Sequence, residues 1–108
     1  MEENDVLLAL TALSQMHRLR IFRMLVVAGH DGLMPAQLTE QFNVAPATLS
    51  FHLKELTRAG LITQERIGRN LIYRAEFQTM DTLLAYLSEN CCQGSTCLVT
   101  PSHACECA

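Results

Sequence analysis

Apolar residues recur at intervals of three and four in several stretches of the chain, the spacing that keeps them on one face of a helix. This pattern predicts a first helix over residues 4–13 and a second that follows Ser14, which we expect to act as its N-cap. Gly29 ends the second helix, and Pro35 begins a short third one. The apolar positions expected on the inner faces of these helices are Val6, Leu7, Leu10, Leu13, Leu19, Phe22, Leu25, Val26, Leu38 and Phe42.

A fourth helix is predicted after a tight corner at Asn43 and Val44, with Pro46 in its first turn and Gly60 as its stop signal. Its apolar positions are Leu49, Leu53 and Leu56, which recur at helical spacing and are expected to face the core. The opposite side of this helix is mostly small or polar. Its members are Ala47, Thr48, Ser50, Phe51 and Lys54.

Two short strand-like runs, LITQERI and LIYRA, follow the fourth helix and are joined by Gly68-Arg69-Asn70, which is typical of a β-hairpin. A last helix is predicted from about Gln78 to Asn90, with one apolar seam made of Met80, Leu83, Leu84, Leu87 and Cys91. The order of elements is helix-helix-helix-helix-strand-strand-helix. It predicts a mainly α fold with a small β-hairpin, namely a winged helix-turn-helix.

Charge is distributed unevenly along the chain. The net charge of the 108 residues is -3, which argues at first sight against a nucleic-acid partner. Between residues 46 and 74, however, five basic residues outnumber two acidic ones, a local balance of +3. An acidic protein with one basic face can still bind DNA. The basic residues are Lys54, Arg58, Arg66, Arg69 and Arg74, and the acidic ones are Glu55 and Glu65.

The predicted recognition helix and hairpin supply the candidate DNA contacts. Thr48 and Ser50 are expected to reach base edges or phosphates, Phe51 a thymine methyl group, and Lys54 a phosphate. Arg66, Arg69 and Asn70 lie where the wing of such a fold meets the DNA backbone or minor groove, and Ala47 is counted with the exposed side of the helix. We expect His52 to be a structural hydrogen-bonding residue. Arg18, Arg20 and Arg23 of the second helix could hold phosphate, but we expect them to pair within the domain.

Three segments carry a family resemblance: MHRLRIFRMLV, LTEQFNVAPATLSFHLKELTRAGLI and RIGRNLIYR. Together they resemble the ArsR/SmtB family of metal- and metalloid-responsive transcriptional repressors, from about Leu8 to Leu87. The resemblance implies a homodimer that binds a palindromic operator on double-stranded DNA and leaves it when an inducer binds. It also implies that the first and last helices form the dimer interface, through Leu7, Leu10, Met80, Leu83, Leu84 and Leu87.

All five cysteines lie in the last eighteen residues, in the segment 91–108 that we separate from the DNA-binding and dimerisation domain 1–90. Two other sensor positions of the family lack their ligands here: residues 34–42 contain no cysteine, and Leu83 stands where the zinc sensors pair a histidine with Asp81. Trivalent arsenic is soft and takes three thiolates. We therefore predict an arsenic(III) inducer, or the similar antimony(III), bound by Cys91, Cys92 and Cys97, with Cys105 and Cys107 as less favoured ligands.

Other readings of the cysteines stay open at this point. The same repressor could sense oxidants, or a divalent metal such as zinc or cadmium with His103 as a fourth ligand. The tail could also belong to a thiol metal-binding interaction module without a DNA role. No acid-base pair or nucleophile suggests an enzyme, and no organic cofactor is expected. The acidic N-terminus does not resemble a signal peptide and no membrane span is evident, so we expect a cytoplasmic protein.

Overall fold

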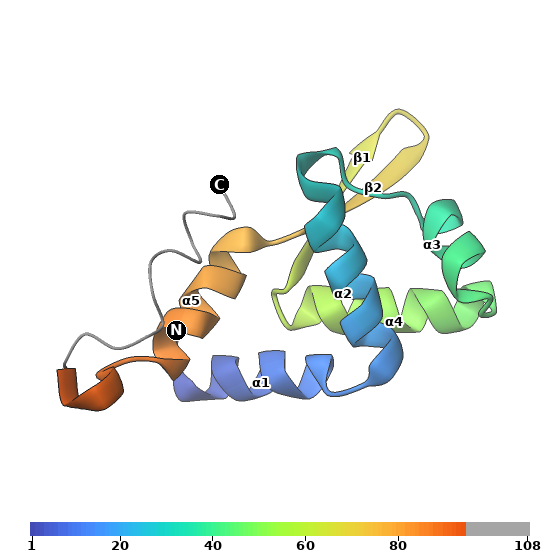
Figure 1. Cartoon of the computed structure of the whole chain (residues 1–108). Helices are drawn as coiled ribbons and strands as arrows, with labels where there is room; N and C mark the ends of the chain where they lie inside the picture. Colours follow the sequence, from blue (N-terminus) through green and yellow to red (C-terminus); the bar gives the residue numbers. More distant parts are fainter. Residues whose placement is uncertain (95–108) are drawn as a thin grey trace.

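The computed structural model describes residues 1–94, so the predicted ligands Cys97, Cys105 and Cys107 lie outside the described residues. Within residues 1–94 the chain forms five α-helices, a two-stranded antiparallel sheet and two short 3-10 helices (Figure 1). The order of elements is the one predicted for a winged helix-turn-helix. The elements are α1 (Glu3–Leu13), α2 (Met16–Ala28), η1 (Gly29–Asp31), α3 (Pro35–Phe42), α4 (Pro46–Arg58), β1 (Ile62–Ile67), β2 (Asn70–Ala75), α5 (Phe77–Leu87) and η2 (Cys91–Gly94).

The N-cap of α2 differs from the predicted one. Gln15 holds this position, and its side chain accepts a hydrogen bond from the Arg18 backbone N–H at 2.9 Å. Ser14 instead lies at the C-cap of α1, where its hydroxyl donates to the Thr11 carbonyl at 2.7 Å. The prediction for Ser14 was therefore wrong because a serine between two closely spaced helices can serve the end of one or the start of the other.

The hydrophobic core lies where α2 crosses α1 and α4, and β1 and β2 close one end of it (Figure 1). Leu25, Leu38 and Leu56 are completely buried. Leu19, which we expected in the apolar stripe of α2, is 44% exposed, and Ile21 occupies the core in its place. The buried apolar residues are Val6, Ala9, Ala12, Ile21, Phe22, Leu25, Leu38, Leu49, Leu53, Leu56, Leu61, Ile62, Tyr73, Ala75 and Leu83.

The hairpin is tighter than the predicted three-residue connection. Ile67 pairs with Asn70, so Asn70 belongs to β2 and the turn consists of Gly68 and Arg69 alone. Gly68 has a φ of +64°, which a two-residue hairpin turn of this kind requires at its first position. The base of the hairpin is tied to the segment after α2, because Leu33 and Tyr73 exchange backbone hydrogen bonds of 2.9 and 2.8 Å.

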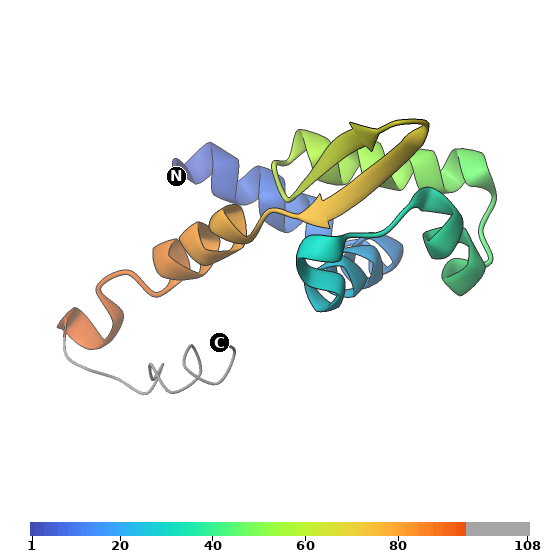
Figure 2. The same ribbon diagram turned by 90° about the horizontal axis from the view of Figure 1, so that it is seen from above.

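The last helix ends three residues earlier than predicted. It stops at Leu87, and Asn90, Cys92 and Gln93 then adopt left-handed backbone conformations. The sequence predicted that Cys91 continues the apolar seam of α5. In the structure it begins η2 instead. Figure 2 shows α5 extending away from the body formed by α1–α4 and the hairpin. No helix within residues 1–94 is long and apolar enough to cross a membrane.

Candidate nucleic-acid interface

Helix α4 is held in the domain by one face and presents the other to solvent. Leu49, Leu53 and Leu56 are each at most 2% exposed, as the sequence predicted. On the opposite face the phenyl ring of Phe51 is 55% exposed. All the side chains of α4 expected to contact DNA are exposed, namely Ala47, Thr48, Ser50, Phe51 and Lys54. Packing therefore fixes which side of α4 is available to a ligand.

The corner between α3 and α4 positions the start of this helix. Asn43 ends α3 in a left-handed conformation, with φ of 52°, and Val44 packs against the core. Ala45 follows as the N-cap of α4 and offers no side-chain acceptor, and Pro46 lacks an N–H group. The backbone N–H groups of Ala47 and Thr48 are therefore not capped by a side chain, and a helix N-terminus of this kind attracts phosphate.

A groove of about 360 Å³ separates α4 from the hairpin. Ser50 and Lys54 line one side of it, and Gln64 and Tyr73 line the other. The remaining lining residues are Thr57 and Arg58, and burial raises the pKa of Tyr73 above its ordinary value. Sequence reasoning missed Thr57 and Gln64, because their contribution depends on how the hairpin lies against α4.

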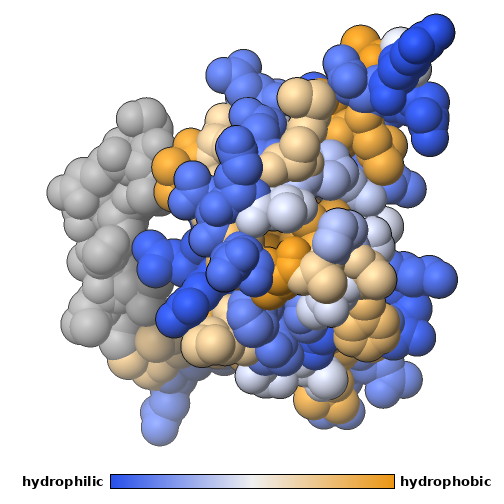
Figure 3. Space-filling view, turned by 90° about the vertical axis from the view of Figure 1, so that its right-hand side faces the viewer, coloured by the Kyte–Doolittle hydropathy of each residue, from blue (hydrophilic) through white to orange (hydrophobic). Residues whose placement is uncertain are grey.

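The basic residues of this region divide into two groups. Arg58 pairs with Glu55 at 2.8 Å, and Arg74 pairs with Glu65 at 2.7 Å and also donates to the His30 carbonyl. Lys54, Arg66 and Arg69 are exposed, and none of them forms an ion pair within the part of the chain that the structure describes. Figure 3, which views the molecule from the right-hand side of Figure 1, shows hydrophilic side chains dominating the surface between scattered apolar ones.

His52 lies on the inner side of α4, where we expected a structural role. It is only 6% exposed, and its Nδ1 atom lies 3.4 Å from Nη1 of Arg18 on α2. Its ring also stacks on the His17 ring, with 5.6 Å between centroids. Burial, and then the charges of Arg18 and His17, lower the pKa of His52 below its ordinary value of 6.5. Arg20 and Arg23, which were also expected to pair inside the domain, form no ion pair among residues 1–94.

The apolar residues assigned to the dimer interface fall into two groups. Leu7, Leu84 and Leu87 are each more than 50% exposed, and Leu10 is 39% exposed. Leu83, in contrast, is only 5% exposed because it packs into the core of its own chain, and Met80 is half-buried against that core. The available apolar surface is therefore formed by α1 and by the outer side of α5.

The two cysteines within the described residues lie in η2, which residues 88–90 separate from the end of α5. Their Sγ atoms are 3.6 Å apart. Adjacent residues of a regular helix point about 100° apart, but the left-handed backbone at Asn90 and Cys92 interrupts the helical geometry and lets the two sulfur atoms approach each other. Among residues 1–94 no three histidine, cysteine or acidic side chains are grouped closely enough to hold a metal ion. A three-thiol site at Cys91 and Cys92 thus requires a ligand from beyond residue 94.

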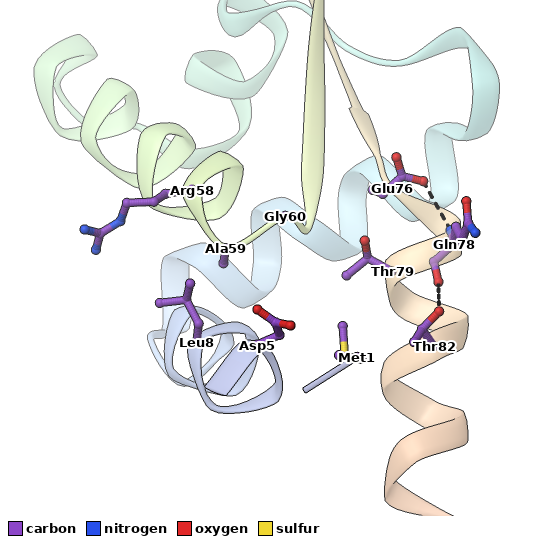
Figure 4. Close-up of a pocket in the computed structure, with 10 residues that line it drawn as sticks. All are labelled: Met1, Asp5, Leu8, Arg58, Ala59, Gly60, Glu76, Gln78, Thr79 and Thr82. Atoms are coloured by element: carbon purple, nitrogen blue, oxygen red, sulfur yellow. Dashed lines mark hydrogen bonds between the residues drawn. The ribbon is translucent and has the colours of Figure 1, made fainter. Parts of the chain in front are cut away.

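A second hollow, of about 470 Å³, lies between α1, the α4–β1 corner and the first turns of α5 (Figure 4). Asp5 and Leu8 line it from α1, and Thr79 and Thr82 line it from α5. Glu76 borders the hollow, and its carboxylate accepts the Gln78 N–H at 3.2 Å, which caps α5. None of the predicted DNA contacts lines this hollow, although Arg58 borders both the hollow and the groove beside the hairpin.

Comparison with known proteins agrees with this geometry. A helix-turn-helix domain family matches residues 13–65. The structure of HlyU from Vibrio cholerae N16961 is similar, with 29% identity and a TM-score of 0.62, over 81% of this chain and 97% of that one. The repressor BigR from Xylella fastidiosa shares 27% identity, with a TM-score of 0.60, over 82% and 88% of the two chains. A possible transcriptional regulator for arsenical resistance shares 28% identity, with a TM-score of 0.63, over 74% and 80%. No curated protein matches the sequence significantly.

The fold and the exposed face of α4 define a winged helix-turn-helix protein, a class that binds DNA through its second motif helix. The similar structures include a transcriptional repressor and a possible transcriptional regulator, so the relatives of this chain are DNA-binding regulators of transcription. An ArsR-like regulator from Rhodococcus sp. RHA1, at 24% identity and a TM-score of 0.70, adds agreement on the fold over 79% of this chain and 77% of that one.

Proposed function

We propose that this protein is a homodimeric transcriptional repressor that leaves its operator when arsenic(III), or antimony(III), is bound by Cys91, Cys92 and Cys97. The observation that supports this sensor site is the pair of sulfur atoms 3.6 Å apart in η2, shortly after the end of α5. Among the similar structures, one is described as a possible regulator for arsenical resistance, which favours this inducer over others.

The DNA-binding part of the proposal rests on α4 and the hairpin. The exposed hydroxyls of Thr48 and Ser50 suit hydrogen bonds to base edges, and the phenyl ring of Phe51 suits apolar contact with a thymine methyl group. Lys54, Arg66 and Arg69 supply positive charge on the same side without ion-pair partners among the described residues. These are the charges that can displace counterions from phosphates.

The homodimer rests on the exposed leucines of α1 and α5. A soluble domain rarely leaves a row of such side chains uncovered without a partner. A second copy related by a twofold axis covers them with the same surface and places two recognition helices on successive turns of a palindromic operator. Helix α5 is then both part of the dimer interface and the anchor of the two cysteines.

The chemistry of the sensor follows from the softness of trivalent arsenic. Arsenous acid exchanges its three hydroxyl groups for three cysteine sulfurs, and three water molecules leave. Closing this centre ties the segment after α5 to the end of a dimer helix, which changes how the two subunits present their recognition helices. A coupling of about 3 kcal/mol between the two sites would weaken DNA binding on the order of 150-fold.

The first experiment tests DNA binding. The reduced wild-type protein is used to select duplexes from a random-sequence library, and affinity for the selected duplex is measured by fluorescence anisotropy. We expect a palindromic duplex to be selected, and we expect the double variant Thr48→Ala with Ser50→Ala to lose most of the preference for it. Failure to select any duplex sequence would contradict a repressor function.

The second experiment tests the inducer with the same duplex. Arsenite is titrated into the complex, and we expect release for the wild-type protein and loss of release for Cys91→Ser, Cys92→Ser and Cys97→Ser. The matched control is the double variant Cys105→Ser with Cys107→Ser, which we expect to respond like the wild type. Unchanged affinity of the wild type in arsenite would refute the proposed inducer.

The short distance between the sulfurs of Cys91 and Cys92 also favours a second candidate, a repressor that responds to oxidants. In that case hydrogen peroxide releases the duplex, arsenite does not, and mass spectrometry finds a loss of two hydrogens for each disulfide formed. Zinc and cadmium are added as further arms of the titration. A divalent-metal sensor would respond to them and not to arsenite.

A further inference from the structure

Arg18 connects three helices of the DNA-binding domain. It lies in the first turn of α2, and its Nε atom donates to the Ala12 carbonyl in the last turn of α1 at 2.8 Å. From the same guanidinium group, Nη1 lies 3.4 Å from Nδ1 of His52 on α4. One planar group therefore links a proposed dimer helix to the recognition helix.

The direction of this link decides the protonation state of His52. A guanidinium group has donors only, so Nδ1 of His52 must be the acceptor and the ring proton must lie on Nε2. The imidazole is therefore neutral in this arrangement. Protonation of Nδ1 would set an N–H group against an N–H group and bring two positive charges together, so the contact with Arg18 would be lost.

Among the described residues, no opposite charge lies against His52 to stabilise its protonated form. From α2 it is faced by Arg18 and by the stacked ring of His17, while Ala12 of α1 contributes only a carbonyl that Arg18 already uses. The nearest ring on its own helix is that of Phe51, at 5.7 Å between centroids. Within residues 1–94 no carboxylate pairs with His52. Burial and the two basic neighbours accordingly lower its pKa.

His52 is also placed where a shift would reach the DNA contacts. It follows Phe51 directly in α4, and it lies one helical turn after Thr48, so both exposed side chains move with the backbone that carries the buried imidazole. A change in how α4 packs on α2 would therefore reorient the exposed side chains of α4.

We propose that Arg18 is a positioning residue for the recognition helix. It holds α4 against α1 and α2 through neutral His52, and protonation of His52 breaks this link and weakens DNA binding. This makes the repressor sensitive to pH by a route independent of the cysteines. The inference rests on the proposed DNA-binding function but not on the proposed inducer.

The first test compares the wild type with His52→Asn on the selected duplex between pH 8.0 and 5.0. The Asn amide oxygen accepts the Arg18 hydrogen bond but does not titrate, so the two proteins should bind almost equally at pH 8.0. Linkage allows at most a tenfold change per pH unit for each proton, and the proposed dimer carries two His52 side chains, so we expect the wild type to weaken by about threefold or more relative to the variant by pH 5.0. Taking the ratio removes the general gain in DNA affinity that any protein shows as its acidic groups protonate.

The matched control is His30→Asn, which removes an exposed imidazole in η1 while retaining the backbone carbonyl that accepts from Arg74. This variant should follow the pH profile of the wild type. A constant ratio of wild type to His52→Asn across the pH range would overturn the inference, as would an equal effect of His30→Asn.

The second test needs no DNA and covers the case in which His52→Asn does not fold. The pKa of His52 is measured by NMR in the wild type, in Arg18→Met and in Arg20→Met, which removes an exposed charge from the same helix. We expect the pKa to rise in Arg18→Met and to stay unchanged in Arg20→Met. Equal pKa values in all three proteins would overturn the inference. If the wild type binds no DNA at any pH, both the proposed function and this inference are wrong. If the wild type binds DNA but the ratio of its affinity to that of His52→Asn does not change with pH, only this inference is wrong.

Discussion

The recognition helix α4 and the last helix α5 are of similar length but are held in the domain very differently. Four residues of α4 are buried, namely Leu49, His52, Leu53 and Leu56. Only Leu83 is buried in α5, while Leu84 and Leu87 on the same helix are more than half exposed. One helix is fixed by its own chain, and the other leaves apolar surface exposed among residues 1–94.

This difference suits the two roles that we propose. A helix that reads DNA must present its side chains in a fixed orientation, and burial of one whole face achieves this. A helix that transmits a signal must instead change its relations to its neighbours at small cost in free energy, and few buried contacts make that possible. The cysteines follow the loosely held helix and not the firmly held one.

The largest expected effect comes from weakening the anchor of α4. Leu53→Ala removes a side chain that is 2% exposed and leaves a cavity, which should lower the free energy of unfolding by about 2–5 kcal/mol. Phe51→Ala, on the exposed side of the same helix, removes a larger side chain and should change stability far less. Urea denaturation of both variants measures the difference. Equal losses would show that the two faces of α4 are not held as differently as their burial indicates.

The next prediction concerns the contact with a second copy that we propose for the exposed side of α5. In the proposed dimer, the double variant Leu84→Glu with Leu87→Glu places four charges in the interface, so it should shift the protein from dimer to monomer in analytical ultracentrifugation. We expect the dissociation constant to rise at least tenfold, which corresponds to about 1.4 kcal/mol. Val27→Glu is the matched control, since Val27 is an apolar residue of α2 with 83% exposure. A dimer that survives the double change must use another surface.

The attachment of the hairpin beside α4 is tested at Gly32. Its φ is +67°, and an added Cβ atom would lie only 2.6 Å from the Tyr73 carbonyl oxygen. Gly32→Ala should therefore destabilise the protein by about 1–3 kcal/mol, from backbone strain together with the forced separation of Leu33 from Tyr73. Gly68→Ala has a similar φ of +64° but meets nothing within 4 Å, so it measures the strain alone. If the two variants lose equal stability in thermal unfolding, close packing of the hairpin contributes nothing.

The sequence predicted the firmly held part of the fold well for a physical reason. Where a helix buries one face, the spacing of its leucines is fixed by the core, so Leu49, Leu53 and Leu56 could be assigned by periodicity alone. Helix ends are set by local hydrogen bonds in which neighbouring residues compete. This is why the cap of α2 was misplaced by one residue and the end of α5 by three.

The candidate sites divide in the same way. The exposed side of α4 followed directly from its buried side, but Leu83 was assigned to the dimer surface although it packs into the core of its own chain. A seam of apolar residues does not reveal which of them face the same chain and which face a partner. The groove residues Thr57 and Gln64 and the contact between Arg18 and His52 depend on how elements distant in sequence pack together, which no local pattern encodes.

The smallest expected effect concerns the exposed basic side chains of α4 and the hairpin. Lys54→Ala and Arg69→Ala each remove an exposed charge that has no ion-pair partner among the described residues. If each side chain contacts one phosphate, the slope of log affinity against log salt should become shallower by about 0.9 per contact, or about twice that in a dimer. Arg23→Ala removes an exposed charge from α2 and should leave the slope unchanged. Because phosphate contacts are not specific to sequence, affinity should fall by the same factor for selected and for random duplexes, and a loss confined to the selected duplex would instead assign Lys54 or Arg69 to base recognition.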